Sequence, residues 1–318
     1  MSLARRVVRI GAALVGCGVL ALASGSAAGA SGATAAAAAQ ASALGGRIPV
    51  VSVSMSDAGG FSLPGTVHSG LVTFRVSSPE ASYHALQGFR LNPGFTVDDI
   101  IHDLTLGVLG ETGADNALGH QLLLQQAVLV GGVVTAPDGP ISITIQLEQG
   151  TYYFFDLNDL FLGVTPRVHR LEARGAEVSG GLPKFDAAIV ATMSGADDLP
   201  IFQNVPATLR HDGTFFFLNA SDELHEAVFR PTRDGITDQY ITDFYDAVIS
   251  GGPRPESPWI GAQRGLQALS PNRWAVVHIE LNTGPNALIC YVPSDEAGPP
   301  QNGLPHGYIG MHNMLDLT

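Results

Sequence analysis

An internal repeat constrains this chain more than any other feature of its sequence. His84 is followed by a glycine ten positions later and by a threonine twelve positions later, and His225 is followed by the same residues at the same distances. Further along each half, three alternating aliphatic residues precede Gly150 and, at identical spacing, Gly284. Chance does not maintain this order and spacing in both halves, so the sequence predicts two copies of one domain.

Each copy consists mainly of predicted strands. Residues 141–147 read ISITIQL, in which every second residue is apolar, as in a strand with one buried face. The chain's 38 glycines and 20 prolines supply the turns that many short strands need. One helix is expected in each copy, beginning after Thr96 and after Thr237, because threonine caps a first helical turn. We therefore predict an all-β fold of two tandem Greek-key β-sandwich domains, each with a short helical insertion.

Residues 1–30 have the features of an export signal. A basic start, MSLARRVVR, is followed by an apolar stretch and by small residues, among which Ala28-Gly29-Ala30 suits signal peptidase. Leu14-Val15-Gly16-Cys17 resembles a lipobox, but the apolar run continues beyond Cys17, which favours secretion over a lipid anchor. We expect a secreted or cell-envelope protein that is not an integral membrane protein, because no later apolar run reaches the ~20 residues of a membrane-spanning helix.

The rest of the sequence divides into four segments. Residues 31–46 are rich in Ala, Gly and Ser and predict a flexible tether. The two copies are expected at 47–175 and 186–318, and the Gly- and Pro-containing stretch 176–185 is expected to link them. The net charge is −13 and no basic run follows the leader, so nucleic acid is not an expected partner.

Cys290 is the one cysteine that remains once a leader containing Cys17 has been removed. It then has no disulfide partner within the chain, which leaves a buried apolar role, pairing with another chain, a reactive thiol or a metal ligand. His306 and Met311 follow it in the segment ICYVPSDEAGPPQNGLPHGYIGM. His225 is the histidine of the second copy that the repeat singles out.

In a predicted sandwich, these residues resemble the copper ligands of cupredoxins. The resemblance covers both copies and is closest to secreted bacterial cupredoxin-like proteins that carry a helical insertion after the first histidine and end in a Cys…Pro-His…Gly-Met segment. It implies one mononuclear, type 1-like copper ion held by His225, Cys290, His306 and Met311, a set whose geometry suits both Cu(I) and Cu(II). Met314 is the reserve axial ligand.

Two features depart from the family pattern. Fifteen residues separate Cys290 from His306, whereas the usual loop is much shorter, although the turn-forming insert SDEAGPPQNG could return His306 to the metal. In the first copy, Asp156 stands at the position that corresponds to Cys290, and no methionine follows at the matching place. We therefore expect the first copy, which retains His84, to be degenerate and free of type 1 copper.

The resemblance implies electron transfer with an exported redox partner protein. A copper carrier or scavenger would use the same ligands, and a metal-free β-sandwich binding module would use none of them. Multicopper oxidases show His-x-His pairs and copper nitrite reductases need further histidines, whereas this chain has no His-x-His pair, so we expect it not to be an enzyme. The other histidines are scattered singly and are expected on the surface or in turns: His68, His84, His102, His120, His169, His211 and His278.

Overall fold

A computed structural model describes residues 47–318 of the chain, apart from 58–59, 80–81, 136, 138, 179, 195–198 and 300. The predicted export signal at 1–30, the tether at 31–46 and the lipobox alternative at Cys17 lie outside the described residues. All described residues belong to one unit. Among them, no helix has the length and apolar character needed to cross a bilayer.

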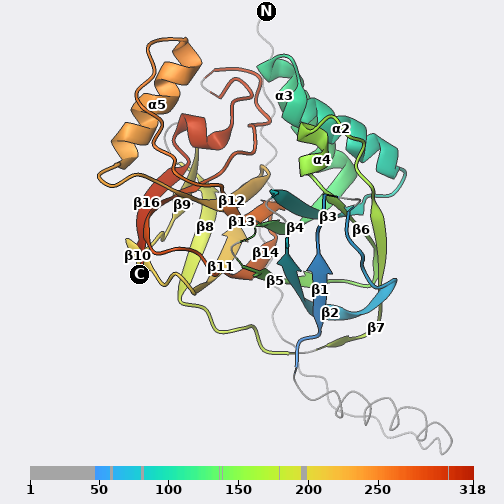
Figure 1. Ribbon diagram of the computed structural model, residues 1–318. Coiled ribbons are helices and arrows are strands. Elements are labelled where there is room, and N and C mark those ends of the chain that lie inside the picture. The colour runs from blue at the N-terminus through green and yellow to red at the C-terminus, as the bar shows by residue number, and fades with distance from the viewer. Residues whose placement is uncertain are drawn as a thin grey trace, which may run out of the picture. The chain divides into compact units, whose positions relative to one another are not determined.

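Strands are the predominant secondary structure of this unit, as the all-β prediction requires (Figure 1). The strands are β1 (Val50–Ser54), β2 (Thr66–Ser77), β3 (His84–Leu91), β4 (Ala127–Thr135), β5 (Ile141–Leu147), β6 (Gly150–Asp156), β7 (His169–Val178), β8 (Ala187–Met193), β9 (Pro200–Gln203), β10 (Thr208–Leu209), β11 (Thr214–Asn219), β12 (His225–Pro231), β13 (Arg264–Leu269), β14 (Trp274–His278), β15 (Gly284–Ile289) and β16 (His312–Leu317). The helices are α2 (Val97–Leu109), α3 (Gly113–Gln126), α4 (Asn158–Phe161) and α5 (Asp238–Ser250), with a 3-10 turn η1 (His306–Ile309).

The paired strands form two layers that enclose a shared core. One layer runs in the order β10, β16, β15, β12, β13, β4, β3, β6, and the other runs β2, β5, β14, β11, β8, β9. β7 pairs with β6 on one side and with β2 on the other, so it joins the layers at one edge. The fold is therefore a β-sandwich, as predicted.

Both layers continue from the first half of the chain into the second. β13 pairs antiparallel with β4, where Leu266 lies opposite Val133, and β14 pairs antiparallel with β5, where Val277 lies opposite Ile143. An unpaired edge strand would leave its backbone N–H and C=O groups without hydrogen bonds. These two pairings supply hydrogen-bond partners to edge strands of both halves at once. The two halves thus meet edge to edge within one sandwich.

The core follows from strand alternation. In β11, Phe215 and Phe217 are fully buried while the intervening Phe216 lies on the opposite face. In β5, the alternating Ile141, Ile143, Ile145 and Leu147 are all buried, which agrees with the period-two interpretation of ISITIQL, and the intervening Thr144 is buried as well. Side chains from both halves contribute to the largest buried cluster, so the two halves share their main core.

The helices begin where the sequence predicts. Thr96 accepts a hydrogen bond from the backbone N–H of Asp99 in a capping box, and Thr237 caps α5 in a similar way. The prediction of a single helix in the first insertion is wrong, because α3 follows α2. The apolar residues of α3 do not form one stripe, and its capping box at Thr112 was the available signal.

The four candidate ligands all lie at the ends of strands or in the turn between them. His225 begins β12, Cys290 directly follows β15, His306 begins η1 and Met311 directly precedes β16. Figure 1 shows η1, α5 and the α2 and α3 pair at the same end of the sandwich. The fold therefore gathers the candidate site at its helical end.

The continuity of the layers predicts cooperative unfolding. Leu266 is fully buried at the β13 to β4 junction, so Leu266→Ala should lower the free energy of unfolding by about 2–5 kcal/mol through lost packing. Denaturant unfolding followed by tryptophan fluorescence and by far-UV circular dichroism should give one coincident transition in both proteins. Ile260→Ala, at an exposed residue, is the control and should change stability little. Two transitions, with only one shifted, would mean that the halves fold independently.

Candidate metal centre

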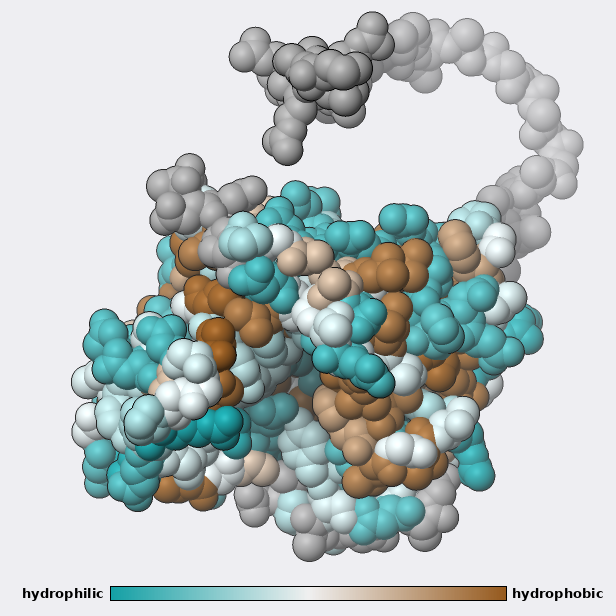
Figure 2. All heavy atoms as spheres, turned by 90° about the horizontal axis from the view of Figure 1, so that it is seen from above, coloured by the Kyte–Doolittle hydropathy of each residue, from teal (hydrophilic) through white to brown (hydrophobic). Residues whose placement is uncertain are grey.

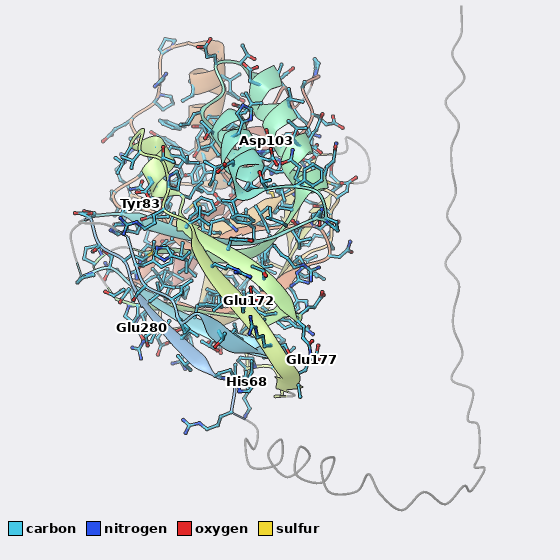
Figure 3. The ribbon with its side chains drawn as sticks, turned by 90° about the vertical axis from the view of Figure 1, so that its right-hand side faces the viewer. His68, Tyr83, Asp103, Glu172, Glu177 and Glu280 are labelled. Carbon is cyan, nitrogen blue, oxygen red and sulfur yellow. The ribbon has the colours of Figure 1, made fainter. Side chains whose placement is uncertain are left out.

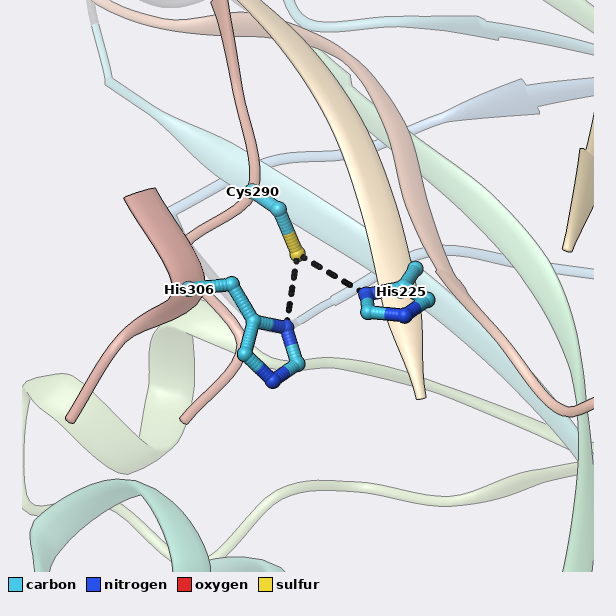
Figure 4. A group of neighbouring side chains, drawn as sticks. All are labelled: His225, Cys290 and His306. Atoms are coloured by element: carbon cyan, nitrogen blue, oxygen red, sulfur yellow. Dashed lines mark hydrogen bonds between the residues drawn. The ribbon is translucent and has the colours of Figure 1, made fainter. Parts of the chain in front are cut away.

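Three of the predicted ligands converge on one point. The Cys290 Sγ atom lies 3.4 Å from Nδ1 of His306 and 3.7 Å from Nδ1 of His225, and the three ligand atoms are all within 4.8 Å of one another (Figure 4). All three side chains are completely buried. Among the described residues, this is the group of histidine, cysteine and acidic side chains with the spacing to hold a metal ion.

Strand register places the thiol beside the first histidine. β12 pairs with β15 so that Val228 lies opposite Ile289, which sets the end of β15 next to the start of β12. The backbone N–H of Glu226 lies 3.4 Å from the Cys290 sulfur and donates to it. This geometry depends on main-chain pairing, so substitutions of surrounding side chains should leave it in place.

The long insert between Cys290 and His306 returns as a hairpin. Pro293 and Pro305 form a β-bridge, and the backbone N–H of Ser294 donates to the carbonyl of Leu304. Closer to the thiol, the N–H of His306 donates to the carbonyl of Val292 at 3.0 Å. These contacts bring the second histidine back to the sulfur, so the unusual loop length is compatible with a three-ligand site.

Helix α3 supports this hairpin from the first half of the chain. The Gln121 side chain donates to the carbonyl of Asp295 at 2.5 Å. At the start of α3, the backbone of Gly113 lies directly against that of Asn302 and Gly303, where an added Cβ on Gly113 would overlap the Asn302 carbonyl oxygen. The close approach therefore requires glycine at position 113.

Met311 lies directly across from Cys290. The register of β15 and β16 pairs Ile289 with His312, and the Cys290 N–H donates to the Met311 carbonyl at 3.3 Å. Opposed residues of an antiparallel pair project to the same face, and both side chains are fully buried in the main core. Met314 instead packs beside α5 in a second cluster, so Met311 is the methionine on the thiol's side.

A buried carboxylate orients the second histidine. Glu223 Oε2 lies 2.7 Å from Nε2 of His306, and Glu223 is only 4% exposed. A proton on Nε2 serves this hydrogen bond and leaves the Nδ1 lone pair free beside Cys290, which is the arrangement that a metal-binding imidazole needs. Nε2 of His225 is also buried but has no hydrogen-bond partner within the described chain.

Burial determines the charge states of the site. It lowers the pKa of His306 to about 3 and that of His225 well below its ordinary value, so both imidazoles are neutral and able to bind a metal. It raises the pKa of the Cys290 thiol well above its usual range. A cation bound between the three groups would favour the thiolate. Burial also raises the pKa of Glu223 and of Glu226 to about 7.

The first half has a related arrangement without sulfur. His84 begins β3, Asp156 ends β6, and the His84 Nδ1 atom lies 2.5 Å from Asp156 Oδ2, with both side chains buried. A carboxylate thus occupies the place that the repeat assigns to the thiol. The expectation that the scattered histidines are surface or turn residues is wrong for His84 and His120, which are 4% and 3% exposed.

Two acidic residues of the site were not foreseen. Glu223 and Glu226 flank His225 in the segment DELHEAVF, and each contacts the site, Glu223 through His306 and Glu226 through the sulfur. Acidic residues on both sides of a candidate ligand were the available signal. Their burial could not be inferred, because it depends on residues far along the chain: Asp295 donates to Glu223, and Gln267 and Tyr291 donate to Glu226.

Comparisons with known proteins find only distant likenesses. No family model matches the chain, and no curated protein matches it in sequence. Among solved structures, reduced auracyanin from Roseiflexus castenholzii is 16% identical and covers 42% of this chain and 99% of its own, with a TM-score of 0.25. Blue copper oxidase from Nitrosomonas europaea is 13% identical over 85% of this chain and 86% of its own, with a TM-score of 0.22. Copper nitrite reductase from Nitrosomonas europaea is 10% identical over 86% of this chain and 94% of its own, also with a TM-score of 0.22.

These likenesses correct one expectation. The lack of His-x-His pairs predicted that the chain is not an enzyme, and this is contradicted because the similar structures include an oxidase and a nitrite reductase that match most of this chain. At such TM-scores the likeness identifies no particular activity.

The support from α3 predicts a specific sensitivity at Gly113. Gly113→Ala improves intrinsic helix propensity, yet its Cβ would push the hairpin away, so it should lower the free energy of unfolding by about 1–3 kcal/mol. Denaturant unfolding measures this difference. Gly65→Ala, where an added Cβ meets nothing nearby, is the matched control. An unchanged or more stable Gly113→Ala protein would contradict the proposed support.

Proposed function

We propose that this chain is an exported, cupredoxin-like protein that binds one mononuclear copper ion through His225, Cys290 and His306, with Met311 as axial ligand, and transfers electrons through it. The observation that carries the proposal is the convergence of two imidazole Nδ1 atoms and one thiol within 4.8 Å in a fully buried site. The proposal that the protein is exported rests on the sequence of residues 1–30, which has the features of an export signal. The redox partner is proposed to be another exported protein.

The donor set fits copper. Two imidazoles, one thiolate and a thioether on the same side are typical of a trigonal copper site with a weak axial ligand. Structural zinc sites use four strong nitrogen or sulfur ligands, and Met311 cannot serve as one. Both histidines are neutral and Nδ1 of His306 faces the Cys290 sulfur, as binding of such a metal ion requires.

The protein's own residues would hold the ion in a fixed geometry. When bound, copper would supply a centre that cycles between two oxidation states. The hydrogen bond that His306 donates through Nε2 to Glu223 would orient His306, and the Glu226 N–H would stabilise negative charge on the sulfur. Strand pairing on both sides of Cys290 would resist movement of the thiolate when the oxidation state changes.

Burial favours a resident ion over a transported one. A copper carrier must release its metal, and that requires ligands that can open to solvent or to an acceptor. Here the two histidines and the cysteine are completely buried, and the hairpin that carries His306 is anchored to α3. Electron transfer is therefore the function we prefer, with copper carriage as the alternative.

Copper binding can be tested by visible absorption of the purified protein after one equivalent of Cu(II). We expect an intense copper–thiolate charge-transfer band and retention of one copper per chain after dialysis. Cys290→Ser should lose the band because it removes the sulfur, whereas His84→Gln, in the related arrangement of the first half, should retain it. No band in the parent protein, or an equal band in Cys290→Ser, would contradict the proposal.

The role of Glu223 generates a second prediction. Glu223→Gln keeps the size of the side chain but removes the carboxylate that accepts from His306, so copper affinity should fall about 10- to 100-fold. Competition with a chelator of known affinity measures this change. Asp222→Asn, at the neighbouring exposed position, should leave affinity unchanged. Equal losses in the two variants would indicate a general charge effect instead of orientation of His306.

A further inference from the structure

A cavity of about 410 Å³ lies beside the candidate metal centre, where the two halves meet. Its walls include Gln87 from β3, Leu129 from β4 and Gln267 from β13, together with residues next to the candidate ligands such as Glu226 and Tyr291. Figure 2 looks down on the helical end and shows a hollow between the side that carries α5 and the side that carries α2 and α3. This volume is within the range of about 300–1,000 Å³ typical of small-molecule sites.

The cavity presents hydrogen-bond acceptors that the protein leaves unused. Gln87 and Gln267 are 1% and 2% exposed, and the side-chain oxygen of each has no hydrogen-bond partner within the described chain. The carboxyl group of Glu226 accepts one hydrogen bond at each oxygen, from the Tyr291 N–H and from the Gln267 amide, and each oxygen has a further lone pair. A buried acceptor without a hydrogen bond raises the free energy of the folded protein, so a ligand whose O–H groups donate to these oxygens would bind favourably.

The remaining walls suit an aromatic ring. Tyr83, Tyr291 and Tyr308 line the cavity with aliphatic side chains such as Leu129. Tyr308 is held in place by stacking on Tyr245, with ring centroids 4.1 Å apart. Figure 3 shows Tyr83 at the helical end of the sandwich, below the helices. Rigid aromatic and aliphatic surfaces bind another ring through offset or edge contacts.

The charged groups of the cavity favour a neutral ligand. Arg230 donates to the Tyr291 hydroxyl at 3.0 Å and lies over the Trp259 ring at 4.7 Å, while its Nε has no hydrogen-bond partner within the described chain. A negatively charged ligand would lie close to the Glu226 carboxyl group, and a positively charged ligand would lie close to the Arg230 guanidinium, so each would meet a group of like charge. A neutral molecule avoids both unfavourable electrostatic contacts.

We propose that this cavity is a binding site for a small neutral phenol, a single aromatic ring with hydroxyl groups that donate to Gln87, Gln267 and Glu226. The inference goes beyond the proposed function and does not depend on copper, because every group that recognises the ligand belongs to the protein. The ligand would lie next to the candidate metal centre, since the Glu226 N–H also donates to the Cys290 sulfur.

Binding is tested by isothermal titration of the copper-free full chain with resorcinol, under nitrogen. The matched probe is 1,3-dimethoxybenzene, which has the same ring and oxygen positions but no O–H donor. Because each hydrogen bond is worth about fivefold in affinity, resorcinol should bind at least tenfold more tightly. Equal binding of the two probes, or no resorcinol binding up to millimolar concentration, would overturn the proposal.

A variant locates the site. Gln267→Leu has nearly the same volume but removes the unpartnered oxygen, so resorcinol affinity should fall at least fivefold while that for 1,3-dimethoxybenzene should not fall. Gln203→Leu on the exposed end of β9 is the control and should bind resorcinol as the parent does. Unchanged resorcinol affinity in Gln267→Leu would overturn the assignment to this cavity. The probe comparison needs no variant, so it decides the question even where Gln267→Leu does not fold.

Titration of both the copper-free and the copper-loaded chain separates the phenol proposal from the copper proposal. Resorcinol binding to the copper-free protein would stand even where no copper is retained, and copper retention would stand even where no resorcinol binds. Where both occur, a bound phenol should shift the copper–thiolate absorption band, because Glu226 contacts both sites. The Gln267→Leu variant should retain the band but lose most of that shift.

Discussion

The support of the Cys290–His306 hairpin by helix α3 is the contact on which the candidate centre depends. The thiol and His225 are fixed by strand pairing within the second half, but His306 lies at the far end of a long insert. That insert returns because its own backbone forms a hairpin and because Gly113 and Gln121 of α3 hold it. A segment of the first half therefore positions a ligand of the second.

This dependence gives the first half a structural role. It retains a buried histidine, His84, but pairs it with Asp156 where the second half has a thiol. Its strands complete both layers of the sandwich, its helices anchor the hairpin, and its side chains form one side of the cavity beside the centre. The first half therefore supports the candidate centre although it has no thiol at this position.

The candidate ligands could be named from the sequence because the lone Cys290, preceded by His225 and followed by His306 and Met311, resembles a cupredoxin ligand set. The structure brings Cys290, His225 and His306 together. The partners of these residues could not be predicted. The burial of Glu223, the position of α3 and the pairing of β13 with β4 all result from contacts between residues far apart in the chain. Local periodicity contains no information about such contacts, and α3 itself was missed because it has no apolar stripe.

The central claim is that Cys290, His225 and His306 bind one copper ion directly. X-ray absorption at the copper edge tests it most directly, because it counts the atoms around the metal and distinguishes sulfur from nitrogen. The account predicts one short copper–sulfur distance and two imidazole nitrogens in the copper-loaded protein. A first shell of nitrogen and oxygen atoms without sulfur would contradict it, since the buried thiol could not then be a ligand.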